Sequence, residues 1–209
     1  MWAIVVAAGR GDRFGGPKQR EMIAGRSVVE RSVATASEVC DGVVVVLPAA
    51  DSQPVARATA IVPGGATRSA SVRAGLAAVP SEASVIVVHD AARPLATPAL
   101  WRAAIDAVIA GADGALCAVP VTDTIKRVDG DRVVATLDRD ELVAVQTPQA
   151  FRASALRRAH DLLDDATDDG ALVEAAGGTV VVVAGSVVNV KITHPRDVGI
   201  AEALLAATT

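Results

Sequence analysis

The 209-residue sequence predicts an α/β fold, in which a mostly parallel sheet carries helices on both faces and a β-hairpin arm is inserted. Two observations predict this fold. Short Val-rich runs alternate with Ala-rich amphipathic stretches, the order expected when strands and helices take turns. The Val-rich runs are also continuously apolar, which is typical of strands covered on both faces. We expect one domain over residues 1–209, because this length suits one sizeable core.

The first half of the chain supplies strands and helices in alternation. Four apolar runs are interpreted as strands, at residues 3–8, 42–47, 84–89 and 114–119. Three amphipathic stretches between them are interpreted as helices, at residues 27–39, 67–79 and 98–111. Ser27 and Glu30 have the spacing of a capping box, which marks the start of the first helix.

The expected hairpin interrupts this alternation. Residues 123–142 place β-branched side chains on either side of Asp129 and Gly130, a strong signal for a hairpin turn. A helix would be expected at this point of the pattern. The segment is therefore interpreted as a β-arm insertion at about 121–142.

After the arm, the α/β pattern resumes. Residues 142–151 are interpreted as a returning strand. Helices are expected at 152–163 and 167–176, followed by strands at 178–185 and 186–192. A helix at 194–207 ends the pattern, with Pro195 near its first turn, where proline is favoured.

Composition excludes several classes of function. A net charge of -4 and a pI of about 5.4 provide no basic face for nucleic acid or an anionic membrane. Aromatic residues make up only 2%, which disfavours a base-stacking platform. Cys40 and Cys117 lie far apart, and the histidines lack zinc-ligand spacing. Without a recognisable leader or a membrane-length apolar run, the protein is expected to be cytoplasmic.

The loop after the first expected strand is rich in glycine, yet it is not a dinucleotide-binding fingerprint. Gly9 and Gly11 begin that pattern, but Phe14 stands at the position of its third glycine. Pro48 ends the second expected strand, where an acidic partner for a ribose would be needed.

The same loop is also a near miss for a P-loop. Gly11 and Gly16 have the required spacing, but Pro17 intervenes before Lys18. Gln19 stands where a Ser or Thr would hold Mg²⁺. What remains is a glycine-rich loop with two cations, Arg13 and Lys18, which suits a polyphosphate. From this loop alone, a surface turn with solvated charges stays the alternative.

Further motifs decide between these readings. They occur in the order AAGRGDRFGGPKQ, PGGATRSASVRAGL, VHDAARP, VPVTDTIKR, TPQAF, TDD and NVKIT. Together they resemble the 2-C-methyl-D-erythritol 4-phosphate cytidylyltransferase family of the non-mevalonate isoprenoid pathway. The resemblance covers nearly the whole chain, from Ala3 to the last expected helix. It implies a Rossmann-like nucleotidyltransferase fold and transfer of CMP from CTP to methylerythritol phosphate, with Mg²⁺ present and pyrophosphate released. It also implies a homodimer formed through the β-arm.

The resemblance implies four catalytic cations. Arg13 and Lys18 match the first-loop cations that stabilise the transition state. Arg139 matches a cation that grips methylerythritol phosphate. Lys191 matches a cation that positions the attacking phosphate. Because Lys191 interrupts an apolar run, it either snorkels to solvent or points into a charged site.

The resemblance also implies residues that bind the two substrates. Nucleotide contacts match Ala7, Ala8, Gly9, Gly65, Arg68 and Ser71, the last three in the segment that recognises cytosine. The other substrate contacts match Asp90, Arg93, Thr124 and Thr167, and no metal ligand is assigned. From the residues alone, Gly64 and Gly65 can be a simple tight turn, and Asp90 can be a cap. His89 is expected to have a structural role.

Three departures from the family pattern accompany these matches. Arg20 stands where the family usually has Tyr, and Ala66 replaces an acidic residue. The segment between Arg13 and Lys18 is short, which leaves the placement of Arg13 less certain. We also expect the protein to lack a fused downstream pathway enzyme.

The alternative functions are those of a ribitol 5-phosphate cytidylyltransferase and of a non-catalytic nucleotide-binding module. A dinucleotide oxidoreductase is disfavoured by the missing glycine and ribose acid.

Overall fold

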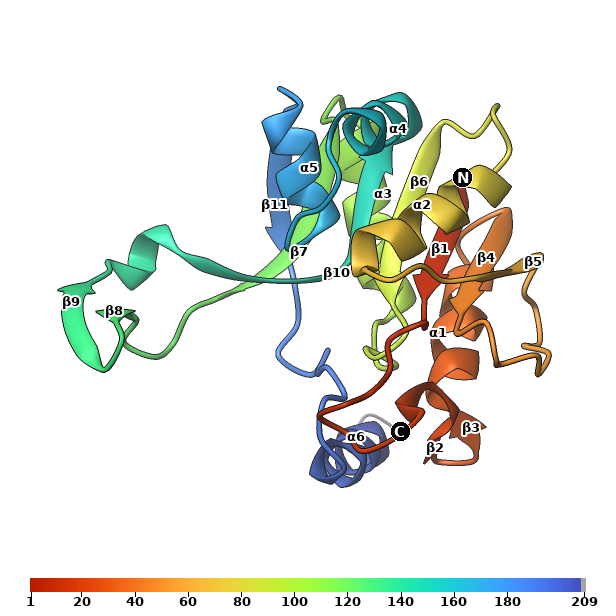
Figure 1. The fold of residues 1–209 in the computed structure, drawn as a ribbon, viewed down its shortest axis with the longest axis horizontal. Helices are drawn as coiled ribbons and strands as arrows, with labels where there is room; N and C mark the ends of the chain where they lie inside the picture. Colours follow the sequence, from red (N-terminus) through yellow and green to blue (C-terminus); the bar gives the residue numbers. More distant parts are fainter. Residues whose placement is uncertain (208–209) are drawn as a thin grey trace.

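The computed structural model describes residues 1–207, and its centre is a seven-stranded sheet (Figure 1). The spatial order of the strands is β11-β7-β10-β6-β1-β4-β5. Every pairing in it is parallel except those of β10, which is antiparallel to both of its neighbours. The expected mostly parallel sheet is therefore confirmed. The strand bounds are β1 Trp2–Val6, β4 Gly42–Leu47, β5 Ala60–Pro63, β6 Val85–Asp90, β7 Gly114–Pro120, β10 Val143–Arg152 and β11 Val180–Ala184.

Helices cover both faces of this sheet, and each face has its own core. On one face, α1 (Val28–Ser37) and α3 (Pro98–Ile109) bury Val33 and Trp101 against the strands. On the other face lie α2 (Arg68–Ala78), α4 (Ala153–Leu162) and α5 (Asp169–Ala175). Central strands such as β4 are buried along their whole length because both faces are covered. The expected capping box of Ser27 and Glu30 is present at the start of α1.

A third, smaller core lies beyond the ends of the strands. Here α6 (Arg196–Ala206) packs near a short hairpin of β2 (Met22–Ile23) and β3 (Arg26–Ser27). Phe14 of the first loop packs against this core. The C-terminal helix is thereby held beside the glycine-rich loop, as Figure 1 shows.

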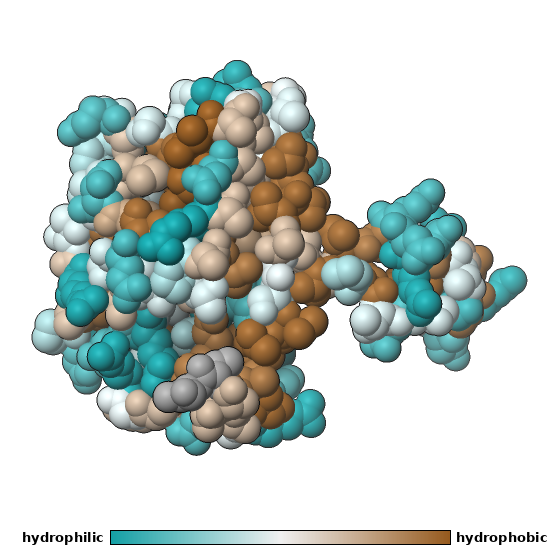
Figure 2. Space-filling view, turned by 180° about the vertical axis from the view of Figure 1, so that it is seen from behind, coloured by the Kyte–Doolittle hydropathy of each residue, from teal (hydrophilic) through white to brown (hydrophobic). Residues whose placement is uncertain are grey.

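The inserted arm extends away from the body of the protein (Figure 1). It consists of β8 (Lys126–Asp129), β9 (Arg132–Thr136) and a 3-10 turn, η2 (Arg139–Glu141). Gly130 has a φ of 58°, as the expected hairpin turn requires, so the inserted hairpin is confirmed. Figure 2 shows apolar side chains along the neck where the arm joins the sheet. The exposed apolar residues of the arm and its neck are Val128, Val133, Val134, Leu137, Val143 and Val145.

The strand expected at 186–192 is wrong. All seven residues are described, and they form a turn and an extended segment that joins no sheet. Asn189 is buried here and donates to the carbonyl oxygen of Thr147, while the amide of Ile192 donates to the carbonyl oxygen of Ala92. Ile192 and Val190 belong to the third core, which explains the apolar pattern that resembled a strand.

The sequence interpretation also omitted three short strands, β2, β3 and β5. Within the described residues 1–207, none of the helices combines the length and the apolar character needed to cross a lipid bilayer.

Candidate active site

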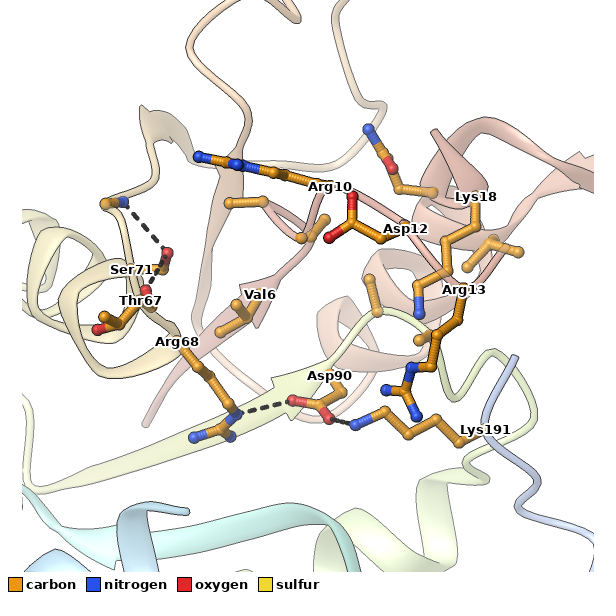
Figure 3. Close-up of a pocket in the computed structure, with 18 of the residues that line it drawn as sticks. Val6, Arg10, Asp12, Arg13, Lys18, Thr67, Arg68, Ser71, Asp90 and Lys191 are labelled. Atoms are coloured by element: carbon orange, nitrogen blue, oxygen red, sulfur yellow. Dashed lines mark hydrogen bonds and ion pairs between the residues drawn. The ribbon is translucent and has the colours of Figure 1, made fainter. Parts of the chain in front are cut away.

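A cavity of about 610 Å³ opens at the carboxyl ends of β1 and β6, the edge where open α/β sheets collect ligands (Figure 3). Five parts of the chain form its wall: the first loop, the first residue of α1, the segment that leads into α2 with the first turn of that helix, the end of β6 with the loop after it, and the segment before α6. Ten predicted site residues line it: Ala7, Ala8, Gly9, Arg13, Lys18, Gly65, Arg68, Ser71, Asp90 and Lys191.

The first loop folds tightly because of its glycines. Gly11 has a φ of +73°, and a Cβ there would overlap the carbonyl oxygen of Gly16. The carbonyl oxygen of Gly11 accepts hydrogen bonds from the amides of Phe14 and Gly15, each 2.8 Å long. This compact turn leads into a 3-10 turn, η1 (Lys18–Arg20), which sets Lys18 beside the cavity.

Five cationic residues line this cavity: Arg10, Arg13, Lys18, Arg68 and Lys191. Arg13, Lys18 and Lys191 lie close together, and each points into the space enclosed by the loops (Figure 3). Burial lowers the pKa of Lys18 below its ordinary value, and the nearby charges of Lys191 and Arg13 lower it further. The ammonium group of Lys18 donates to the carbonyl oxygen of Ile192 over 2.9 Å. Such a concentration of positive charge suits an anion with several charges.

Asp90 is the anionic centre of the site. Its carboxylate accepts from Nζ of Lys191 at 2.6 Å and from Nε of Arg68 at 3.2 Å (Figure 3). Burial alone would raise the pKa of Asp90, but Arg68 and Lys191 hold that pKa well below its ordinary value. The side chain of Asp90 therefore pairs with two cations and does not act as a cap. Lys191 points into a charged site, the second of its two expected positions.

Gly64 and Gly65 lie in the segment between β5 and α2, and Gly65 lines the cavity. The amide of Gly65 donates to Oγ of Ser71 over 3.2 Å, and that hydroxyl donates to the carbonyl oxygen of Thr67 over 2.9 Å (Figure 3). A Cβ on Gly65 would lie 2.5 Å from Cβ of Ala70, and one on Gly64 would overlap the side chain of Ala8. Both glycines are therefore needed for close packing. Recognition of a base by Gly65 and Ser71 stays a prediction.

A second cavity, of about 460 Å³, adjoins the first. Arg68, Asp90 and Lys191 line both cavities and so form the boundary between them. The predicted residues Arg93 and Thr167 line this second cavity. Arg93 is held by a 2.8 Å hydrogen bond from its Nη1 to the carbonyl oxygen of Asn189.

Two predicted site residues are not brought to either cavity. Thr124 and Arg139 belong to the arm and line neither space. Arg139 is exposed, and its Nη1 donates to the carbonyl oxygen of Thr122 over 2.8 Å. Within one chain, the structure therefore brings together three of the four predicted catalytic cations.

Sequence reasoning missed several polar residues of the second cavity. Thr147 accepts a 3.0 Å hydrogen bond from the amide of Asp90 and so fixes the end of β6. Gln149 is almost completely buried in β10 and donates to Asp168 over 2.8 Å. The signal was present, because a polar side chain in the middle of an apolar strand needs a specific partner.

His89 is structural, as expected. It is fully buried, and its ring centroid lies 5.0 Å from that of Trp101. Its Nε2 donates to the carbonyl oxygen of Arg93, while Nδ1 accepts from the hydroxyl of Thr147, each over 3.2 Å. Burial lowers the pKa of His89 to about 4, so the ring is neutral at neutral pH.

The fold and the site together define a class of enzyme. A glycine-rich loop and a cluster of cations line one cavity, and the cations extend to the boundary of a second. This arrangement is that of a nucleotidyltransferase, in which fixed positive charges act on a nucleotide polyphosphate while another substrate lies alongside.

Comparisons with known proteins identify the family. The family model described as 2-C-methyl-D-erythritol 4-phosphate cytidylyltransferase matches residues 1–207. A protein of that name from Frankia casuarinae is 45% identical over 214 residues, covering 98% of this chain and 80% of the relative. The crystal structure of a Thermus thermophilus protein of the same name has a TM-score of 0.84 at 33% identity, covering 97% of this chain and 98% of that one. The chain therefore belongs to the 2-C-methyl-D-erythritol 4-phosphate cytidylyltransferase family.

Some relatives are longer. A Nitrobacter hamburgensis protein named bifunctional enzyme IspD/IspF is 47% identical over 224 residues, which cover 98% of this chain. This chain spans only 55% of that relative's length.

Proposed function

We propose that this chain transfers CMP from CTP to 2-C-methyl-D-erythritol 4-phosphate, giving CDP-methylerythritol and pyrophosphate. One structural observation supports this activity independently of family membership. Arg68, Asp90 and Lys191 stand between two adjoining cavities, and the larger cavity also receives Arg13 and Lys18. A reaction that joins two phosphate-bearing substrates needs such a pair of spaces with positive charge at their boundary.

The first cavity is assigned to CTP. The backbone of Ala7, Ala8 and Gly9 lines it and would approach the nucleotide closely. Gly65, which precedes α2, and Ser71, in the first turn of α2, would read the edge of the cytosine ring with backbone groups and a hydroxyl. We expect these contacts to favour a pyrimidine over a purine.

The second cavity is assigned to methylerythritol phosphate, with Arg93 and Thr167 among its contacts. An oxygen of the acceptor phosphate attacks the α-phosphorus of CTP, and the bond to the leaving pyrophosphate breaks. Arg13 and Lys18 stabilise the negative charge that develops on the phosphates, while Lys191 orients the attacking group. A protein nucleophile is not needed for this transfer.

Mg²⁺ is part of the proposal. Within the described residues, the chain has no cluster of three or more side chains of the kinds that hold a metal. Asp90 and Asp12 line the first cavity, which fits an ion held by one or two carboxylates and by substrate phosphates. Bound there, Mg²⁺ would neutralise charge on the phosphates.

A homodimer through the arm completes the proposal. A two-stranded hairpin is marginal in water by itself, and apolar residues such as Val133 and Val134 are exposed on this one. Packing against the arm of a second copy would cover them and carry Arg139 and Thr124 to the partner's site. Two-fold contacts of this kind are the commonest in soluble oligomers.

The proposal includes a cytoplasmic location, which the two buried free cysteines, Cys40 and Cys117, support.

Two alternative functions predict different results in a simple assay. A non-catalytic nucleotide-binding module would bind CTP without releasing pyrophosphate. A ribitol 5-phosphate cytidylyltransferase would release it only with ribitol phosphate. The test is to incubate the protein with CTP, Mg²⁺ and each acceptor, and to measure pyrophosphate and the nucleotide product.

A further inference from the structure

His160 of α4 and Asp169 of α5 form a buried pair that lines neither cavity. Asp169 is completely buried, and the side chain of His160 is 2% exposed. Nε2 of His160 donates to Oδ1 of Asp169 over 2.9 Å. The other carboxylate oxygen, Oδ2, accepts from Nη1 of Arg68 over 2.7 Å. Both oxygens of a buried carboxylate thus have a donor, and one of these donors belongs to a residue of the site.

A line of alternating partners connects this pair to the site. Arg68 is held by Asp169 at one end, and its Nε donates to Asp90 at the other. Asp90 accepts in turn from Lys191 (Figure 3). His160 therefore lies at one end of a series of contacts, and Lys191, a cation of the proposed reaction, lies at the other.

Removing His160 would leave Oδ1 of Asp169 buried without its donor, which is costly. Arg68 has a nitrogen that can replace it: Nη2 is buried and has no hydrogen-bond partner among the described residues. A guanidinium that donates Nη1 and Nη2 to both oxygens forms the favoured two-bond pair with a carboxylate. That shift would turn Nε of Arg68 away from Asp90. Asp90 would then pair with Lys191 alone and hold that ammonium group away from a substrate phosphate.

We propose that His160 and Asp169 are positioning residues, which keep Arg68 shared between two carboxylates so that Asp90 pairs with both Arg68 and Lys191 and can release Lys191 to the substrate. The kinetic part of this inference rests on the proposed function, but the arrangement of Lys191 does not. The informative substitution is His160→Leu, which keeps an apolar filling and removes the donor. His160→Gln is the conservative variant, because its amide nitrogen can take the place of Nε2.

The first readout is independent of turnover. The chain has three lysines, Lys18, Lys126 and Lys191. Their rates of labelling by an amine-reactive reagent can be followed by mass spectrometry, and Lys126 on the exposed arm serves as an internal reference. We expect His160→Leu to slow the labelling of Lys191 severalfold relative to Lys126, and His160→Gln to restore it. Unchanged labelling of Lys191 in His160→Leu would overturn the inference, whatever the enzyme turns over.

The second readout is kinetic. We expect His160→Leu to lower kcat/KM for methylerythritol phosphate about tenfold, with a much smaller change in the KM for CTP. Leu156→Val is the matched control, because Leu156 is buried in the same helix and has no hydrogen bond to the site. An equal kinetic loss in Leu156→Val, at a similar loss of thermal stability, would show that His160 acts only on the fold and would overturn the positioning role. Failure of the wild-type protein to turn over would refute the proposed function instead, and the labelling result would still decide this inference.

Discussion

Nζ of Lys191 lies 2.6 Å from Oδ2 of Asp90, although 101 positions of sequence separate these two residues. The segment before α6 carries Lys191 across the ends of the strands, and the end of β6 presents Asp90 to it. The contact orients a flexible lysine before any substrate binds. A fixed cation of this kind needs little reorganisation during the reaction, which is how enzymes stabilise developing charge.

Lys18→Ala should lower kcat by about 10²–10³, the usual result of removing one group that stabilises developing charge. The fold should survive, because Lys18 lies in a short 3-10 turn, and the substitution removes one side-chain hydrogen bond, to the carbonyl oxygen of Ile192. Steady-state kinetics and circular dichroism measure the two effects. Lys126→Ala on the arm is the control. A near-normal kcat in Lys18→Ala at saturating CTP would show that Lys18 is a surface charge without a catalytic role.

Complementation tests whether two chains share each site. Lys18→Ala and Arg139→Ala should each be inactive alone, since each removes a cation of the proposed site. In a mixed dimer, one of the two sites should carry neither lesion and recover activity. Subunit exchange is followed with two affinity tags. If mixed dimers form and stay inactive, Arg139 does not serve the partner's site.

Gly64→Ala should weaken both the fold and CTP binding. A Cβ at this position would overlap the side chain of Ala8, so the segment that contains Gly64 must move away from the first loop. We expect a loss of about 1–3 kcal/mol in the free energy of unfolding, together with a raised KM for CTP.

Gly199→Ala is the matched control. Gly199 lies in α6 with no atom within 4 Å of an added Cβ, so the substitution should stabilise the helix by about 0.5–1 kcal/mol. Chemical denaturation measures both variants. Equal and small changes in the two would show that close packing at Gly64 is unimportant.

Stability should fall between pH 6.5 and pH 4 because of His89. Its pKa drops from an ordinary value of 6.5 to about 4 in the folded protein, so the unfolded chain binds the proton more readily in this window. The stabilisation is complete above the unfolded pKa and is lost as the pH falls towards the folded pKa. It amounts to about 3 kcal/mol. Urea denaturation across this range should show a flatter pH profile for His89→Gln, and an equally steep profile would assign the effect to other groups.

Strong local patterns in the sequence predicted the elements that form the framework. The long apolar runs of β1, β4, β6 and β7 are correct because strands buried on both faces must be apolar throughout. The short edge strand β5 was missed because four residues carry too little pattern. The strand expected at 186–192 failed for a tertiary reason, since its apolar residues serve the third core. That one domain spans 1–209 stays a prediction.

The residues of the candidate site were also predicted only in part. The first loop indicated Arg13 and Lys18 because glycines and cations stand close together there, whereas Gly65 was predicted from the family resemblance. The partnership of Arg68 with Asp169 leaves no local signal, since 101 positions separate them. The roles proposed for Thr124 and Arg139 would require a second chain and remain predictions.

The proposed transfer of CMP can be tested by measuring pyrophosphate release with CTP, UTP, ATP and GTP, each with methylerythritol phosphate and with ribitol 5-phosphate. We expect rapid, Mg²⁺-dependent release with CTP and methylerythritol phosphate, and formation of CDP-methylerythritol in equal amount. ATP and GTP should be poor donors, because the contacts proposed for Gly65 and Ser71 match the edge of cytosine. Turnover with ribitol 5-phosphate alone, or similar rates with all four nucleotides, would contradict the proposed function.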